Sequence, residues 1–146
     1  MPGVPSGDAL ADRLAIDDLL TTYACAVDER DWDAFRSVFT VDAILDYTAF
    51  GGPRGSAGEV AEWTARALQV IDASQHFITN LRLQLNGDEA TARTYVYSPL
   101  AVKGGGGIMH AGGSYADRLR RTADGWRITE RVAELTWSDR PVRVPR

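Results

Sequence analysis

Apolar residues recur at helical spacing in the first part of the chain. Across residues 9–27 they form one stripe, which predicts an amphipathic helix with Asp8 as its N-cap. A second, shorter stripe of Trp32, Phe35 and Phe39 predicts another helix directly after the first.

A strand, a loop and a third helix are expected next. Residues 43–47 predict a strand, and the glycines and proline of residues 50–55 predict a loop. Ser56 and Glu59 have the spacing of a capping box, in which each residue bonds the backbone N–H of the other. The third helix is therefore expected to run from this pair to about Val70.

The second half of the chain changes from helical to alternating periodicity. Residues 76–85 alternate, with Leu81, Leu83 and Leu85 on one face, and this pattern predicts a strand. The leucine face could serve either the core or a contact between subunits. Asn86-Gly87 predicts a tight hairpin turn. Three further strands are predicted at residues 90–102, 108–122 and 126–137, with a tight turn between the last two.

This order of elements predicts an α+β protein with an antiparallel sheet. The length of 146 residues suits one domain, and the 45% of hydrophobic residues can supply its core. We expect a single domain of residues 9–140 between a flexible leader, residues 1–8, and a C-terminal tail, residues 141–146. Long strands curled over helices leave an interior, which is a typical place for a ligand.

Charge and composition narrow the function classes. The net charge of −4 gives no electrostatic support to nucleic-acid binding. No apolar stretch approaches the roughly 20 residues that span a bilayer, and the first residues lack the pattern of a secretory signal. Cys25 is the only cysteine, which excludes an intrachain disulfide and fits a cytoplasmic location.

Several short motifs stand in an order that resembles one known family. They are Tyr23-x4-Asp28, Asp31-Trp32-Asp33, Asp46-Tyr47, Gln75-His76-Phe77 with Asn80, and Gly113-x-Tyr115-x-Asp117 leading to Arg131. Over roughly residues 9–140 the chain resembles the dehydratase branch of the SnoaL-like, or nuclear-transport-factor-2-like, superfamily. This branch includes scytalone dehydratase, bile-acid 7α-dehydratase and hexachlorocyclohexane dehydrochlorinase.

The resemblance implies a fold, an activity and an assembly. The fold would be a cone-shaped α+β barrel, with three N-terminal helices packed in a curved, mostly antiparallel sheet. The activity would be a cofactor-independent elimination on a hydrophobic cyclic molecule such as a polyketide, steroid or aromatic intermediate. Members of this fold commonly associate through the outer sheet face, so a homodimer or homotrimer is expected.

Carried over onto this sequence, the family's catalytic dyad falls on His76 and Asp28. An imidazole near neutrality can take a proton from carbon, and a carboxylate on its other nitrogen fixes the tautomer. Tyr23 and Tyr47 could donate a hydrogen bond to a carbonyl or a departing hydroxyl. The alternatives are a core or merely ligand-binding His76, a capping role for Asp28, and core packing for both tyrosines.

Other candidates are weaker in the sequence. His110 is a candidate second acid or base, or a surface residue beside the glycine-rich loop at residues 104–107. Arg131 and Arg140 could bind a carboxylate or carbonyl of the substrate, or could lie on the surface. Asn80 and Trp63 are candidate substrate contacts, although Trp63, like Trp137, could instead belong to a subunit contact.

Two rival functions remain open. Asp46 lies near the position of the proton-shuttling base of ketosteroid isomerase, so an isomerase or cyclase is the second interpretation. The third is a non-catalytic binding module or partner subunit, because this fold also serves those purposes. Two histidines without an acidic cluster make no metal site, so neither metal nor cofactor is expected.

Overall fold

The computed structural model describes residues 7–140, which form three helices and a seven-stranded sheet. The elements in chain order are α1 (Gly7–Glu29), α2 (Trp32–Ser37), β1 (Phe39–Asp46), β2 (Arg54–Gly55), α3 (Ala57–Ala67), β3 (Ile71–Ser74), β4 (Phe77–Asn86), β5 (Glu89–Val102), β6 (Ile108–Thr122) and β7 (Gly125–Ser138). Two 3-10 turns, Thr48–Phe50 and Leu68–Val70, follow β1 and α3. The expected tail at residues 141–146, and residues 1–6 of the expected leader, lie outside the described residues.

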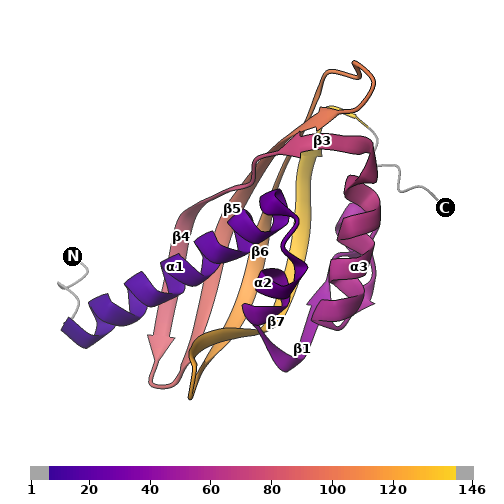
Figure 1. Ribbon diagram of the computed structural model, residues 1–146. Helices are drawn as coiled ribbons and strands as arrows, with labels where there is room; N and C mark the ends of the chain where they lie inside the picture. Colours follow the sequence, from indigo (N-terminus) through magenta and orange to yellow (C-terminus); the bar gives the residue numbers. More distant parts are fainter. Residues whose placement is uncertain (1–6, 141–146) are drawn as a thin grey trace.

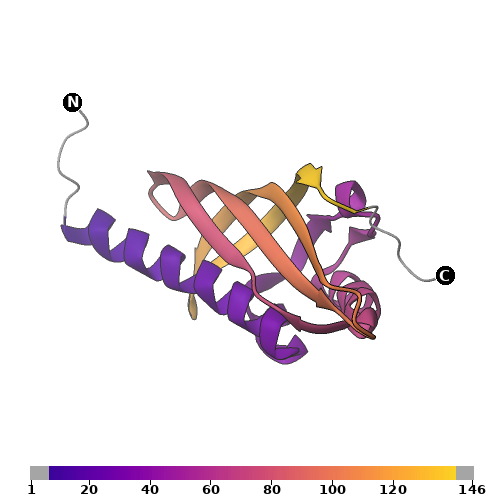
Figure 2. The ribbon, with the colours of Figure 1, turned by 90° about the horizontal axis from the view of Figure 1, so that it is seen from above.

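The strands build one curved sheet that does not close on itself (Figures 1 and 2). The strand order is β2-β1-β7-β6-β5-β3, and β4 also pairs with β5. Only β1 and β7 run parallel; every other pair is antiparallel. The expectation of a cone-shaped α+β fold with three N-terminal helices and a mostly antiparallel sheet is confirmed.

The boundaries differ from the predicted ones where the sequence signals are short. Helix α1 begins at Gly7, so Asp8 lies in its first turn and the predicted N-cap was wrong. The third helix changes to a 3-10 turn after Ala67. Strands β2 and β3, of two and four residues, were missed because so short a segment shows no period.

The capping box and the tight hairpin turn predicted from the sequence are both present in the structure. Ser56 accepts from the backbone N–H of Glu59, and the Glu59 carboxylate accepts from that of Ser56, which confirms the capping box. Between β4 and β5, Gly87 takes a φ of 62°, as a tight hairpin requires.

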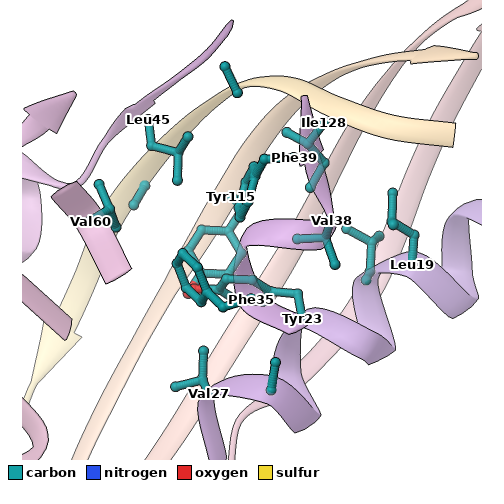
Figure 3. Close-up of a cluster of buried hydrophobic side chains, with 14 of the residues drawn as sticks. Leu19, Tyr23, Val27, Phe35, Val38, Phe39, Leu45, Val60, Tyr115 and Ile128 are labelled. Atoms are coloured by element: carbon teal, nitrogen blue, oxygen red, sulfur yellow. The ribbon is translucent and has the colours of Figure 1, made fainter. Parts of the chain in front are cut away.

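The core lies between the helices and the concave face of the sheet. Figure 3 shows Tyr23, Phe35 and Tyr115 with their rings close together, below Phe39 and Ile128. The leucines of β4 at positions 81, 83 and 85 are half-buried and pack against this cluster, so they serve the core.

An ion pair lies at the bottom of this core. Arg131 on β7 and Asp117 on β6 are both fully buried, and two hydrogen bonds of 2.7 and 2.8 Å join the guanidinium to the two carboxylate oxygens. The guanidinium carbon also lies 4.3 Å from the ring centre of Tyr23 and 4.0 Å from that of Tyr115. Buried charge is costly unless it is paired this completely.

We expect Asp117→Asn to lower the free energy of unfolding by about 3–5 kcal/mol, because the variant leaves the Arg131 charge buried without its counter-charge. Urea denaturation at neutral pH measures this loss. The matched control is Glu130→Gln, which breaks the exposed pair with Arg118 and should cost less than about 1 kcal/mol. Equal losses in the two variants would contradict the argument.

Candidate active site

A cavity of about 480 Å³ opens between α1, α3 and the concave side of β5 and β6. Most of its lining is apolar or aromatic. The polar or ionisable lining side chains are those of Tyr23, Tyr47, Trp63, Thr64, His76, Ser98, Tyr115 and Arg140. A largely apolar pocket with few polar groups suits a small hydrophobic ligand.

His76 and Asp28 form a tight pair at the wall of this cavity. Asp28 lies in the last turn of α1, and His76 lies between β3 and β4. One carboxylate oxygen of Asp28 lies 2.6 Å from Nδ1 of His76, and the other accepts from the His76 backbone N–H at 2.8 Å. Because an ionised carboxylate only accepts, Nδ1 carries the proton. Nε2 is left with its lone pair, and no hydrogen-bond partner for it is found in residues 7–140.

The pair is partly shielded from solvent, with 12% of the His76 side chain and 22% of the Asp28 side chain exposed. Burial alone would raise the pKa of Asp28. Hydrogen bonds from the His76 ring, the His76 backbone and the Ser74 hydroxyl outweigh it and lower that pKa below its ordinary value. Asp28 therefore stays ionised and holds the imidazole in one tautomer.

Three phenols meet at a second point of the cavity. Tyr23 comes from α1, Tyr47 directly follows β1, and Tyr115 comes from β6. The Tyr23 oxygen lies 2.7 Å from that of Tyr47 and 3.3 Å from that of Tyr115. Arg131 donates to the Tyr47 oxygen at 3.4 Å from behind.

The phenol cluster of Tyr23, Tyr47 and Tyr115 is arranged to donate. Burial raises the pKa of all three hydroxyls far above the ordinary value of 10.0, so each keeps its proton. Two phenol–phenol hydrogen bonds use two of the three protons. One O–H proton therefore remains for an acceptor such as a ligand oxygen.

Comparison with known proteins places the chain in a family. Residues 8–132 match the model of the SnoaL-like domain. The chain belongs to the SnoaL-like family. A curated relative, an uncharacterized protein of Mycobacterium tuberculosis, is 36% identical over 124 residues, which are 84% of each chain.

Solved structures share the fold of this SnoaL-like chain. A proposed aromatic ring hydroxylase of Novosphingobium aromaticivorans is 30% identical, with a TM-score of 0.77 over 92% of this chain and 93% of the other. A proposed scytalone dehydratase of the same species gives 0.82 at 18% identity, over 92% and 91%. A type 3 hexachlorocyclohexane dehydrochlorinase of Novosphingobium barchaimii gives 0.77 at 21% identity, over 95% and 98%. The last two similarities establish the fold alone.

Of the predicted site residues, the structure brings His76, Tyr23, Tyr47, Trp63 and Arg140 to the cavity of the SnoaL-like chain. Asp28 does not line the cavity and acts on it through His76. Tyr23 and Asp28 are five residues apart and so face different sides of α1. His76 nevertheless brings the dyad to the cavity that Tyr23 lines.

His110, Asp46 and Asn80 lie outside the cavity lining. Nδ1 of His110 lies 2.7 Å from the hydroxyl of Tyr97, whose ring stacks on the imidazole, so His110 is not placed to act as second acid or base. Asp46 accepts from the backbone and hydroxyl of Thr48. Asn80, with a φ of 57°, is exposed at an irregularity in β4.

The two predicted arginine contacts differ. Arg131 is neither on the surface nor in contact with the cavity, since it lies fully buried behind the phenol cluster and can reach a ligand only through it. Arg140 lines the cavity, but its guanidinium donates to the backbone carbonyls of Gly106 and Ile108. It thereby holds the glycine-rich loop in place.

An aromatic row marks a different face of the sheet. Phe77, Tyr97 and Trp137 are neighbours across β4, β5 and β7, and all three are exposed. Gly112 lies between them, and a side chain at this position would clash with the Trp137 indole. The expected homodimer or homotrimer stays a prediction.

Sequence reasoning missed four residues of the site. Tyr115 and Asp117 were noticed only as parts of a motif, although their alternation in β6 places both on the concave face. Ser74 and Arg30, which contact Asp28 and its helix end, gave no signal because their contacts join distant segments.

No group of three or more His, Cys, Asp or Glu side chains in residues 7–140 could hold a metal ion. None of the helices described there is long and apolar enough to cross a membrane.

The lowered pKa of Asp28 has a consequence for stability. A carboxyl whose folded-state pKa lies below its ordinary value of 3.8 stabilises the fold above that pH, and the contribution is lost as the pH falls through the folded-state pKa. We expect the difference in unfolding free energy between the wild type and Asp28→Asn to shrink as the pH falls below about 4. Urea denaturation from neutral to acidic pH measures it. A difference that grows as the pH falls below about 4 would contradict the assigned hydrogen bonds.

Proposed function

We propose that this SnoaL-like chain is a cofactor-independent lyase that eliminates a leaving group and a proton from a hydrophobic cyclic small molecule. The observation that carries the proposal is the 2.6 Å contact between His76 and Asp28 at the wall of an apolar cavity. His76 is the base, and Asp28 orients it. The phenol cluster binds an oxygen of the substrate.

The geometry supports a carbon acid as the substrate. Asp28 fixes the proton on Nδ1, so the lone pair of Nε2 takes the substrate proton and Asp28 stabilises the imidazolium that results. Positioned bases of this kind typically contribute on the order of 10²–10⁴-fold in rate. An apolar wall keeps water from competing for the base.

The phenols support a carbonyl beside the carbon that loses its proton. They hold their own protons too tightly to surrender them, so they act as hydrogen-bond donors and not as acids. Such donors stabilise the negative charge that develops on a carbonyl oxygen as the C–H bond breaks. The electron pair of that bond then forms the new C=C bond while the leaving group departs with the pair of its own bond. A departing hydroxide recovers a proton from the His76 imidazolium or from solvent.

The names of two solved neighbours agree with this reaction class. One is called a scytalone dehydratase and another a hexachlorocyclohexane dehydrochlorinase, and both names describe loss of a small molecule HX. For this chain we infer a cyclic substrate with a ring carbonyl and a hydroxyl or halide on the carbon β to it. A cavity of about 480 Å³ accepts a bicyclic or tricyclic molecule of that kind.

An isomerase or cyclase is the second candidate, because the same base could return the proton to another carbon. Asp46, the base expected for that reaction, lies outside the cavity lining and accepts hydrogen bonds from Thr48. An isomerase on this chain would therefore also depend on His76. The substrate, and not the base, would separate the two reactions.

The test is a panel of cyclic β-hydroxy ketones, followed by the ultraviolet absorbance of the conjugated product and by mass spectrometry for the loss of water. We expect His76→Ala to lower kcat/KM on the order of 10²–10⁴-fold, because the base is removed. Asp28→Asn should lower it less, since the imidazole remains but its tautomer is no longer fixed.

His110→Ala is the matched control, because it removes the chain's other histidine from outside the cavity and should leave turnover unchanged. Circular dichroism checks that each variant is folded. A folded His76→Ala variant with wild-type turnover would exclude the proposal. An isomerised product without loss of water would favour the second candidate.

A further inference from the structure

Helix α1 ends in a backbone motif that normally calls for glycine. The N–H of Asp31 bonds the carbonyl of Ala26, and the N–H of Arg30 bonds that of Val27. This is the Schellman pattern, in which the residue after the cap is left-handed and is usually glycine. Here that residue is Arg30, with a φ of 61°. A side chain at this position strains the backbone, and here it makes hydrogen bonds that a glycine could not make.

The Arg30 guanidinium joins the helix end to β3. One of its terminal nitrogens, Nη1, donates to the Val27 carbonyl at 2.8 Å and to the hydroxyl of Ser74 at 2.9 Å. The positive charge of Arg30 also interacts favourably with the negative, C-terminal end of the α1 dipole. Ser74 is buried, so the contact is shielded from competing water.

The direction of the next hydrogen bond follows from the first. A serine hydroxyl has one proton, and here its oxygen already accepts from Arg30. Its proton therefore goes to the Asp28 carboxylate oxygen that lies 2.9 Å away. That same oxygen accepts from Nδ1 of His76. The result is one directed chain of hydrogen bonds from Arg30 through Ser74 to Asp28, which in turn holds His76.

We propose that Arg30 is a positioning residue, which acts through Ser74 to hold the Asp28 carboxylate in the plane and at the distance that keep the proton of His76 on Nδ1. The effect on catalysis rests on the proposed function of His76. The effect on the imidazole itself does not. Arg30 does not line the cavity, and its hydrogen bonds go to the end of α1 and to Ser74.

Arg30→Gly is an unusually clean test, because glycine suits the left-handed backbone better than arginine does. The variant should fold with an unchanged or higher Tm while it loses the side chain. Nitrogen-15 NMR of the imidazole above neutral pH reports which ring nitrogen carries the proton. We expect a single Nδ1–H form in the wild type and a mixture with the Nε2–H form in Arg30→Gly.

Ser74→Ala provides a second route to the same result, since it removes the link and leaves Arg30 in place. Arg118→Ala, which deletes an exposed arginine elsewhere on the sheet, is the matched control and should leave the imidazole signals unchanged. If the proposed lyase activity is found, Arg30→Gly should lower kcat on the order of 10–100-fold with little change in KM. Arg30→Lys should recover part of that loss.

Wild-type imidazole signals in both Arg30→Gly and Ser74→Ala would overturn the positioning role. The NMR outcome is independent of turnover. A mixed tautomer in these variants, together with wild-type activity in His76→Ala, would support the positioning role and exclude the proposed function. Wild-type imidazole signals in Arg30→Gly and Ser74→Ala, together with an inactive His76→Ala, would overturn the positioning role and support the proposed function.

Discussion

The structure depends on the guanidinium of Arg131, a charge that sits in the core with no exposed surface. Every side of that charge must be satisfied from within the protein. Asp117 supplies the counter-charge, the rings of Tyr23 and Tyr115 pack against the guanidinium at right angles to each other, and Tyr47 accepts a third hydrogen bond. Tyr23 lies on α1, Tyr115 and Asp117 lie on β6, Tyr47 follows β1, and Arg131 itself lies on β7. One charge therefore ties helix α1 to three segments of the sheet.

This arrangement separates the polar chemistry of the cavity into two parts. The buried Arg131 holds the phenol cluster in place through Tyr47, whereas the dyad is held in place at the end of α1. The His76 backbone and ring both bond the Asp28 carboxylate, which fixes the segment between β3 and β4 against the helix. Most of the surface between the two parts is apolar, so a ligand gains free energy from burial and is oriented by few polar groups.

The sequence predicts the long elements and the dyad, and it fails where contacts join distant segments. Periodicity located the helices and the four long strands, because each has several residues on one face. It could not place Arg131, which looks like any strand arginine until Asp117 and the tyrosines are seen around it. For the same reason Tyr115 looked like part of a motif, and His110 looked like an acid or base although it contacts Tyr97 on another face.

The count of protons at the cavity limits what the site can do. The dyad presents one lone pair, on Nε2, because Asp28 occupies Nδ1. The phenol cluster presents one unshared proton, because two of its three protons serve the cluster itself. Together the dyad and the phenol cluster supply one acceptor and one donor, which can remove a proton and stabilise the charge that forms on a nearby oxygen. For the proposed elimination this favours a substrate whose own carbonyl accepts the charge first, so that the leaving group departs from an activated intermediate.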